Sequence, residues 1–395
     1  MSRKKHKMTH PKQYIWQWPS WPGFRWDNAA LLELLGICRF RQGALLTQMR
    51  DIGFEVQQQS RAEVLIAETL KTSEIEGEHL DPDTVRSSVA RRLGLPTAGL
   101  TLPGHEHADG VIDTLLDATL NHEQALTLER LFGWHAALFP TGYSGLHKIR
   151  VAAWRGDREG PMRVVSGPMG REKVHYEAPP ADRLGGEMDQ FFRWWGQNKS
   201  MDGLLRAGMG HLWFVAIHPF EDGNGRIART LTEMALAQDE KLVDRYYSLS
   251  SQIMTRRESY YTVLEHTNRG DGDITEWMVW FLECLSAAIL NADDLLSNVM
   301  VKSRFWKRHA QTELKERQCK VINRLLEAGP GAFEGGLTNR KYAGMGHVSK
   351  ATAQRELADL VRKGILRPNP GGGRSTSYDL CWDELAGVAG QTKKG

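Results

Sequence analysis

The sequence predicts a mainly helical protein with one short β element and a small basic module at its C-terminal end. Apolar residues recur at three- and four-residue steps over most of residues 28–297. Residues 143–176 are instead rich in Gly, Pro and Val, which is typical of a β-hairpin or an extended loop. Residues 301–395 carry 18 Lys and Arg against 9 Asp and Glu (+9), whereas residues 1–300 carry 33 against 39 (−6).

Length and composition exclude several classes of protein. The 395 residues are 41% hydrophobic and 25% charged, a balance of globular proteins and not of disordered or membrane-embedded ones. The sequence has no run of about 18 apolar residues that would predict a spanning helix, and its basic first residues do not read as a secretory signal. Its four cysteines lie far apart without metal-ligand spacing. We therefore expect a cytoplasmic protein without a membrane span. Its length indicates two or three domains, which we place at residues 1–100, 101–297 and 298–395.

The N-terminal part is predicted to be an irregular segment followed by helices. Residues 14–27 hold four tryptophans and two prolines. Prolines argue against a continuous helix, so we expect this segment to wrap over a core and anchor by aromatic burial. From Asn28 to about Leu93 the apolar pattern is helical, and Gly77 with the Asp-Pro-Asp turn at 81–83 closes the second helix.

Further helices are predicted on both sides of the β element. They cover about residues 106–139, 184–197, 201–217, 226–239, 251–269 and 273–297. A polar stretch at about residues 297–309 is expected to lead into the basic module.

The basic module has the element order of a winged helix-turn-helix. Its predicted elements are helices over 318–327, 337–345 and 349–363, followed by a glycine-tipped hairpin. Ser349 is the expected N-cap of the third helix, whose Lys350 and Arg355 would face a DNA major groove in that motif. Arg367 and Arg374 on the hairpin would meet phosphates. Residues 301–395 therefore fit either DNA binding or partner docking through a solvated charged face.

The residues with recognisable chemistry lie in one stretch, HPFEDGNGRIAR, at residues 218–229. An apolar helix runs into it, and a new helix starts near Gly225. Gly223 and Gly225 flank Asn224, and such residues tolerate positive φ and can turn successive backbone N–H groups toward an anion. This nest would lie at a helix N-terminus, where the helix dipole also favours negative charge.

The side chains of the same stretch suit a metal-bound polyphosphate. Arg226 and Arg229 are three residues apart and share a helix face, and guanidinium forks match phosphate oxygens. Asp222 offers the oxygen ligand that Mg²⁺ prefers. His218 titrates near neutrality and can accept a proton from a hydroxyl.

The stretch resembles the H-P-F-x-[DE]-G-N-G-R-x-x-R signature of Fic-domain proteins. The resemblance covers about residues 105–290, and the Trp/Pro-rich N-terminal part looks like the leader domain of some bacterial Fic proteins. It implies a helical Fic core with a β-hairpin flap, and transfer of AMP from ATP to a Ser, Thr or Tyr hydroxyl of a protein, self-modification included. It also implies Mg²⁺ as cofactor and a homodimer.

The resemblance implies a role for each residue of the signature. His218 would deprotonate the target hydroxyl, and Asp222 would bind Mg²⁺ on the α- and β-phosphates. The 223–225 nest would hold the phosphates, and Arg226 and Arg229 would clamp the outer ones.

A second motif resembles the inhibitory [ST]-x-x-x-E-[GN] segment of the same family. Residues 72–77 read TSEIEG. The resemblance implies that Glu76 pairs with Arg229 and blocks productive placement of the γ-phosphate. The same glutamate could also orient a water for the removal of AMP.

Two further sets of residues resemble family positions. Val174 and His175 resemble the flap that aligns the target peptide by β-augmentation. Tyr260, Tyr261 and Asn268 resemble positions near the adenine. Adjacent tyrosines on a helix cannot face the same way, so one of the two is expected in the core.

Three functions stay open from the sequence. The first is an auto-inhibited protein adenylyltransferase, a nucleotidyltransferase. The second is a DNA-binding transcriptional regulator in which the Fic body acts as a sensor. The third is a Fic enzyme that transfers another nucleotide. The intact base, carboxylate and pair of arginines favour an enzyme that uses a triphosphate donor.

Overall fold

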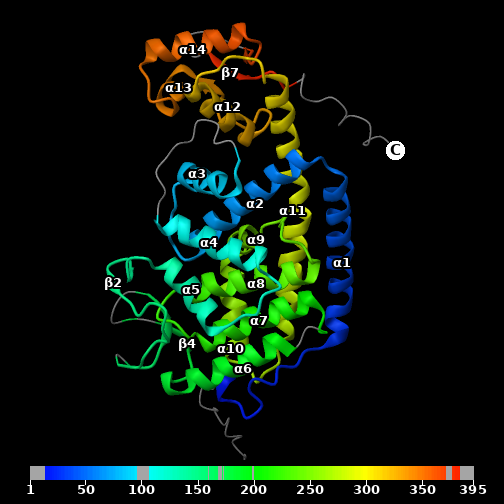
Figure 1. Ribbon diagram of the computed structural model, residues 1–395, viewed down its shortest axis with the longest axis vertical. Coiled ribbons are helices and arrows are strands. Elements are labelled where there is room, and N and C mark those ends of the chain that lie inside the picture. The colour runs from blue at the N-terminus through cyan, green and yellow to red at the C-terminus, as the bar shows by residue number, and fades with distance from the viewer. Residues whose placement is uncertain are drawn as a thin grey trace, which may run out of the picture. The chain divides into compact units, whose positions relative to one another are not determined.

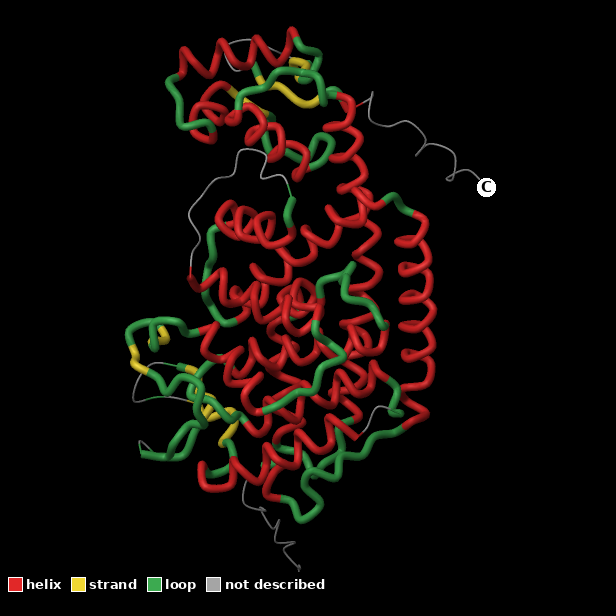
Figure 2. Tube along the Cα trace, in the orientation of Figure 1, coloured by secondary structure: helices red, strands yellow, loops and turns green. Residues whose placement is uncertain are grey.

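The protein is built mainly of helices, with three small antiparallel sheets among the described residues (Figures 1 and 2). The structure is a computed structural model that describes residues 14–95, 106–158, 160–167, 171, 173–197, 200–370 and 376–382. The predicted mainly helical class with short strands is confirmed.

The chain divides into two compact units. The first comprises residues 1–49, 63–89 and 103–291, and the second comprises residues 50–62, 90–102 and 292–395. The boundaries at residues 100 and 297 stay a prediction of how the sequence is organised, whereas the compact units draw on interleaved segments of the chain.

The helices that precede the basic module include long and deeply buried ones. They are α1 (Asn28–Asp51), α2 (Phe54–Ile75), α3 (Pro82–Leu93), α4 (Glu106–Leu120), α5 (Leu128–Leu138), α6 (Leu184–Gln197), α7 (Gly203–Ile217), α8 (Asn224–Glu240), α9 (Leu249–Thr255), α10 (Arg257–Asn268) and α11 (Thr275–Arg308). Helices α7 and α8 are buried on nearly all sides and pack against each other. Helix α7 is largely apolar, as is typical of a helix in the centre of a core, whereas α8 also buries Arg226, Arg229 and Glu233. The predicted chemical stretch joins these two helices.

The tryptophan-rich N-terminal segment lies irregularly along the first unit, as expected. It begins with the short 3₁₀ helix Ile15–Gln17. The Trp16 indole N–H donates to the Glu177 carbonyl at 2.7 Å, and the Trp21 indole N–H donates to Glu187 at 2.7 Å. The ring of Trp21 also meets Trp213 of α7 edge-on. The indoles therefore anchor the segment through hydrogen bonds as well as ring contacts.

Two hairpins occupy the stretch predicted as a β element. Strands β1 (Tyr143–Ser144) and β2 (His147–Lys148) form the first, and β3 (Arg163–Ser166) and β4 (Lys173–Glu177) form the second. The second hairpin has a register shift between Val164 and Val165.

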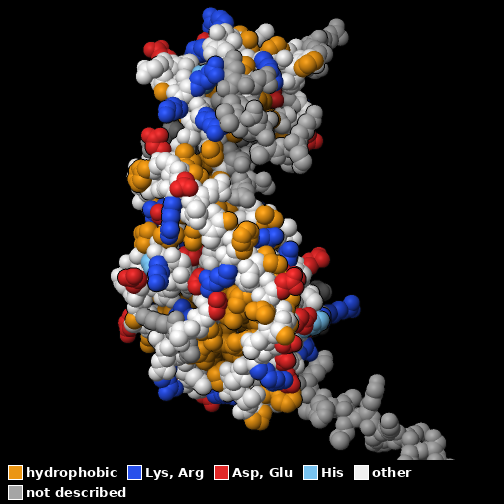
Figure 3. Space-filling view, turned by 90° about the vertical axis from the view of Figure 1, so that its right-hand side faces the viewer, with side chains coloured by type: hydrophobic (Ala, Val, Ile, Leu, Met, Phe, Trp, Pro, Cys, Tyr) orange, Lys and Arg blue, Asp and Glu red, His pale blue; other side chains and the backbone are white. Residues whose placement is uncertain are grey.

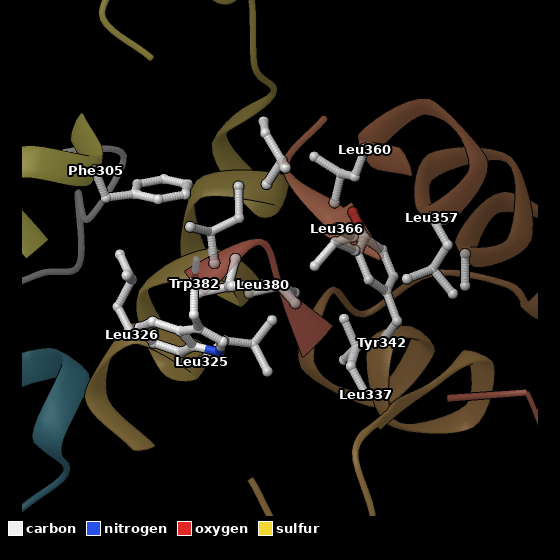
Figure 4. Close-up of a cluster of buried hydrophobic side chains, with 14 residues drawn as sticks. Phe305, Leu325, Leu326, Leu337, Tyr342, Leu357, Leu360, Leu366, Leu380 and Trp382 are labelled. Carbon is white, nitrogen blue, oxygen red and sulfur yellow. The ribbon is translucent and has the colours of Figure 1, made fainter. Parts of the chain in front are cut away.

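The basic module has three helices followed by two strands, as predicted, and an additional short strand, β5, where the start of the second helix was expected. It contains α12 (Glu316–Ala328), β5 (Leu337–Thr338), α13 (Asn339–Met345), α14 (Lys350–Arg362), β6 (Leu366–Pro368) and β7 (Ser377–Leu380), with sheet order β5-β7-β6. Its own core gathers Leu325, Tyr342, Leu357, Leu366 and Leu380 (Figure 4).

The structure differs from the sequence-based prediction where the chain enters this module. The polar stretch expected at residues 297–309 belongs to α11, which continues to Arg308. The reason is that Val299 and Phe305 are buried at 3% and 2% exposure, so this stretch is an amphipathic helix with one buried apolar side and one polar side. Arg374, predicted on the hairpin, lies outside the described residues.

Among the described helices, none combines the length and hydropathy that a membrane span requires. Helix α1 nevertheless leaves Leu32 and Phe40 exposed at 72% and 79%. The side of the molecule on which α1 lies shows gathered hydrophobic side chains (Figure 3).

Candidate active site

The loop between α7 and α8 reverses the chain through two left-handed residues. His218, directly after α7, has φ 52°, and Gly223, the N-cap of α8, has φ 82°. A Cβ atom on Gly223 would lie 2.8 Å from the ring of Phe139. Glycine is therefore required at this position by both the backbone conformation and the close approach.

Asn224 holds the loop from the inside. Its side-chain oxygen accepts from the Phe220 N–H at 3.0 Å, and its side-chain nitrogen donates to the Phe220 carbonyl at 2.9 Å. The predicted phosphate-holding role of Asn224 thus falls to its backbone, because the amide side chain is already used. The first N–H groups of any helix have no intrahelical acceptor, and Gly223 has no side chain to cap those of α8. These N–H groups therefore suit an anion.

His218 is held in the tautomer that a base requires. Its Nδ1 lies 3.3 Å from the carbonyl oxygen of Val215, which can only accept, so Nδ1 carries the proton and Nε2 has a free lone pair. Burial, assisted by the positive charge of Arg155, lowers the pKa of His218 to about 4. The imidazole is therefore neutral at physiological pH.

Arg155, which the sequence analysis did not single out, supports His218 from behind. It is 2% exposed. Its Nε donates to the His218 carbonyl at 2.7 Å, and its Nη2 donates to the Pro179 carbonyl at 2.5 Å. One buried guanidinium thus ties the left-handed histidine to the end of the flap. The only sequence signal was a single arginine after the apolar run VAAW.

Asp222 lies in the same loop with its carboxylate held from two sides. The Gly223 N–H donates to one oxygen at 2.5 Å, and the Ser144 hydroxyl of β1 donates to the other. The Asp222 carbonyl accepts from Nε2 of His135 at 3.2 Å, and the Ala152 N–H donates to Nδ1 of that ring. His135 is fully buried, and burial lowers its pKa to about 4. Ser144 and His135 were missed because they are distant in the sequence.

The donor set at Asp222 fits Mg²⁺ that arrives with a nucleotide. Among the described residues there is no cluster of three or more His, Cys, Asp or Glu side chains that could hold a metal. Mg²⁺ in nucleotide sites is commonly bound by one or two carboxylates together with substrate phosphates. Each oxygen of Asp222 accepts one hydrogen bond from a described residue, and a carboxylate oxygen can accept more than one.

Arg229 is engaged by the end of α2. Its Nη2 lies 2.7 Å from Glu76 Oε1, and its Nε donates to the Thr72 hydroxyl at 2.6 Å. Burial disfavours the charge of Arg229, but Glu76 outweighs this effect and raises the pKa. A Cβ atom on Gly225 would lie 2.2 Å from Glu76 Oε1, so the carboxylate rests directly on the predicted nest.

A second ion pair, absent from the sequence analysis, engages the other arginine. Arg226 Nη1 lies 2.9 Å from Glu78 Oε2, and its guanidinium lies over the ring of Phe139 at 4.8 Å. Glu78 follows α2 in the turn that Gly77 permits through its φ of 86°. We call residues 72–78 the strap. Two of its three glutamates, Glu76 and Glu78, meet the two arginines of the signature.

Both arginines retain an unpaired buried donor. Nε of Arg226 and Nη1 of Arg229 have no hydrogen-bond partner within the part of the chain that the structure describes, although the two side chains are 3% and 2% exposed. Buried polar groups are nearly always paired, so such a group calls for an explanation. Two orphaned cationic donors beside a helix N-terminus indicate an anion site.

Helix α10 fastens the strap. Arg257 donates to the Ile75 carbonyl from Nε and Nη2, at 3.1 and 2.8 Å, and the Tyr261 hydroxyl donates to the same oxygen at 3.2 Å. Tyr260 faces the core, where it is 2% exposed and its hydroxyl lies 2.9 Å from Nε2 of His211.

Asn268 is also buried, and its side-chain oxygen has no partner among the described residues. That one of the adjacent tyrosines is a core residue agrees with the expectation. The adenine-binding roles of Tyr260, Tyr261 and Asn268 stay predictions.

The predicted flap residues lie on β4 and are tied to α10. Arg269 donates to the Val174 carbonyl at 2.8 Å and to the His175 carbonyl at 3.2 Å. The His175 ring meets Glu265 at 2.5 Å. These carbonyls are therefore already occupied, and the β-augmentation role of Val174 and His175 stays a prediction.

Two family models match separate parts of the chain. A model of a domain of unknown function, DUF4172, matches residues 14–95, and a model of the Fic/DOC family matches residues 125–236. The second match includes His218, Asp222 and both arginines of the signature.

Among solved structures, a Fic family protein from Desulfovibrio desulfuricans G20 is similar at 20% identity and a TM-score of 0.52, over 90% of this chain and 96% of that one. A Fic domain containing signaling protein from Bacteroides thetaiotaomicron matches at 16% identity and TM-score 0.48, over 68% and 97% of the two chains. Fic-1 from C. elegans matches at 17% and 0.49, over 68% and 74%. The first of these likenesses shows a common fold, and the Fic/DOC family model matches residues 125–236, the part of the chain that carries the candidate site.

Proposed function

We propose that the protein is an auto-inhibited protein adenylyltransferase, which transfers AMP from ATP to a Ser, Thr or Tyr hydroxyl of a protein. Fic-family domains generally transfer nucleotide groups onto proteins, and the finer assignment is argued from the site. The observation that carries it is the buried pair of Arg229 and Glu76, at 2.7 Å, in the same loop system as a neutral histidine whose Nε2 is free.

In this mechanism His218 acts as the general base. Its Nε2 accepts the proton of the target hydroxyl, the hydroxyl oxygen forms a bond to the α-phosphorus, and pyrophosphate leaves with the bridging oxygen. Arg155 keeps the imidazole neutral and oriented, since it donates to the His218 carbonyl and its charge opposes protonation. In the folded protein the base is therefore ready before the substrate arrives.

The rest of the loop stabilises negative charge. The first N–H groups of α8 and the orphaned donors of Arg226 and Arg229 would receive phosphate oxygens, which suits charge development in the transition state. Asp222 would hold Mg²⁺, which when bound neutralises phosphate charge. Two arginines that each have an unpaired N–H group favour a nucleoside triphosphate over a shorter phosphate chain. This supports ATP as the substrate, and the nucleotide competition below tests the identity of the nucleobase.

The strap explains why the enzyme would be inhibited. Glu76 occupies Arg229 and covers Gly225, and Glu78 occupies Arg226. Phosphate oxygens and these carboxylates compete for the same guanidinium groups, and like charges repel each other in a poorly solvated site. A productive triphosphate therefore requires that the strap carboxylates withdraw.

Intact-mass spectrometry after incubation with ATP and Mg²⁺ tests this function. We expect Glu76→Gly to gain adenylyl groups by self-modification, the wild type to gain far fewer, and Glu76→Gly/His218→Ala to gain none. Glu76→Gln is the matched control, because its amide oxygen can still accept from Arg229 and should preserve part of the inhibition.

The same preparation separates the competing functions. A folded Glu76→Gly protein that takes no adenylyl group contradicts the proposal, whereas an adduct formed with GTP, CTP or UTP in preference to ATP would show another nucleotide donor. Loss of AMP from pre-modified protein in the presence of wild type and Mg²⁺, and no loss with Glu76→Gly, would identify the removal reaction instead.

A further inference from the structure

The exposed side of α14 is a second candidate binding surface, because it carries basic and small polar or apolar residues and no acidic ones. Exposed positions recur along this helix at helical spacing, while Leu357 and Leu360 on the opposite side are buried in the core of the module (Figure 4). Ala353 belongs to the same core. With the exposed Arg340 of the neighbouring α13, we define the α14 outer face as Arg340, Lys350, Ala351, Gln354, Arg355 and Ala358.

Two short-linked helices present this face. Helices α13 and α14 are packed together and are separated only by residues 346–349. Thr338 caps the first helix and Ser349 the second, each through a side-chain oxygen that accepts a backbone N–H. Two helices joined by a turn of this length form a helix-turn-helix unit, whose second helix can enter a DNA groove.

The carboxylates of α14 are already neutralised inside the module. Glu356 is 3% exposed and pairs with Arg317 at 2.7 Å and Lys315 at 3.1 Å. Asp359 pairs with Lys363 at 2.7 Å and Arg362 at 3.0 Å. The helix has no other acidic residue, so none of the exposed side chains of α14 is acidic.

The basic side chains of the outer face, in contrast, have no acidic partner among the described residues. Within the described residues, Arg340 and Lys350 form no ion pair, and Arg355 makes only a 3.5 Å contact to the Thr352 hydroxyl. Residues 301–395 as a whole carry a net charge of +9. The unpaired cations therefore lie on the exposed side of α14, whose other exposed residues here are small or polar, and on the adjacent helix α13.

We propose that the α14 outer face binds the major groove of duplex DNA. An α-helix fits this groove, where Gln can pair with adenine and Arg with guanine. Ala351 and Ala358 leave room for close approach to base edges, while Arg340 and Lys350 lie where phosphates would be met. The deep, narrow major groove of duplex RNA does not admit side chains, and the face lacks the large aromatic anchors typical of protein interfaces. This activity is separate from nucleotidyl transfer.

Fluorescence anisotropy of the full chain with a labelled mixed-sequence duplex tests the proposal. We expect the wild type to bind at 50 mM salt, and the affinity to fall steeply toward 200 mM as counterions compete. Arg340→Gln/Lys350→Gln/Arg355→Gln should bind at least about tenfold more weakly, with a log–log salt slope smaller by roughly 2 to 3.

Arg355→Gln and Arg362→Gln form the matched pair. Both remove one exposed guanidinium from α14, but Arg362 is already paired with Asp359 and is the last residue of the helix, about two turns beyond Arg355. We expect a loss of several-fold in affinity for the first and less than about twofold for the second. Far-ultraviolet circular dichroism confirms that both are folded.

Three results would overturn the proposal. They are absence of wild-type binding at low salt, equal losses for Arg355→Gln and Arg362→Gln, and stronger competition by duplex RNA than by duplex DNA. His218→Ala should bind DNA like the wild type, so failure of DNA binding and failure of adenylyl transfer are separate outcomes.

Discussion

The two compact units use arginine in opposite ways. In the first, Arg226 and Arg229 are almost fully buried and each is paired with a glutamate of the strap. In the second, Arg355 is exposed and unpaired, because the two carboxylates of its helix are held by other bases. The anion site thus lies in the part of the chain with net charge −6. The net charge of a region indicates which charged partners it attracts at long range. A buried ion pair instead indicates that the pair must separate before a charged ligand can bind.

The largest expected effect comes from comparing one arginine substitution in each unit by the same measurement, the rate of adenylyl transfer. In the Glu76→Gly background, Arg229→Gln should lower adenylyl transfer by about 10² to 10³-fold, since it removes a preorganised charge from the phosphates. Arg355→Gln in the same background should leave transfer unchanged. Initial rates with labelled ATP measure both, and equal effects of the two substitutions would erase the distinction between the units.

Within the second unit, Glu356→Gln should destabilise the basic module without touching its outer face. It breaks charge-assisted hydrogen bonds to Arg317 and to Tyr342, which we expect to cost about 1–2 kcal/mol. Thermal unfolding measures the loss, and DNA affinity of the folded fraction should stay within about twofold. Arg362→Gln, on the same helix, is the control that should unfold like the wild type.

Within the first unit, Glu78→Gln should raise self-adenylylation less than Glu76→Gly does. Glu78 is 37% exposed and Glu76 29%, and only Glu76 covers the nest. An increase of roughly three- to fivefold corresponds to about 1 kcal/mol, as expected for a partly exposed ion pair. Glu74→Gln is the matched control, since Glu74 pairs with Lys71 and not with the signature arginines. No difference between Glu78→Gln and Glu74→Gln would remove Glu78 from the strap's function.

The smallest effect concerns pH. Because burial and Arg155 lower the pKa of His218 to about 4, the base stays neutral above that value, and the rate of Glu76→Gly should decline on the acid side only near pH 4 to 5. Arg155→Gln removes the opposing charge, so the pKa of His218 rises and the acid limb should move to higher pH. A pH–rate profile distinguishes this change in pKa from a purely structural loss. A structural loss would lower the maximal rate without moving the pH at which the rate declines.

Local pattern was sufficient wherever the relevant residues are close in the chain. The periodicity of apolar residues predicts most helices, and the contiguous 218–229 stretch brings a base, a carboxylate and two arginines together within one loop. It failed where packing overrides polarity, as in α11, whose burial of Val299 and Phe305 carries the helix through a stretch expected to be a linker.

What the sequence by itself determined is the set of chemical groups in the loop, because their spacing follows directly from a helix end and a turn. Only the tertiary structure decided which distant side chains complete that set: Arg155 behind His218, Ser144 on Asp222, and Glu78 on Arg226. It also decided that the side-chain amide of Asn224 forms hydrogen bonds with the backbone of Phe220 in the same loop. The physical reason is that hydrogen bonds and ion pairs depend on distances of about 3 Å between atoms, and such distances between remote segments are set by the packing of the helices that carry them.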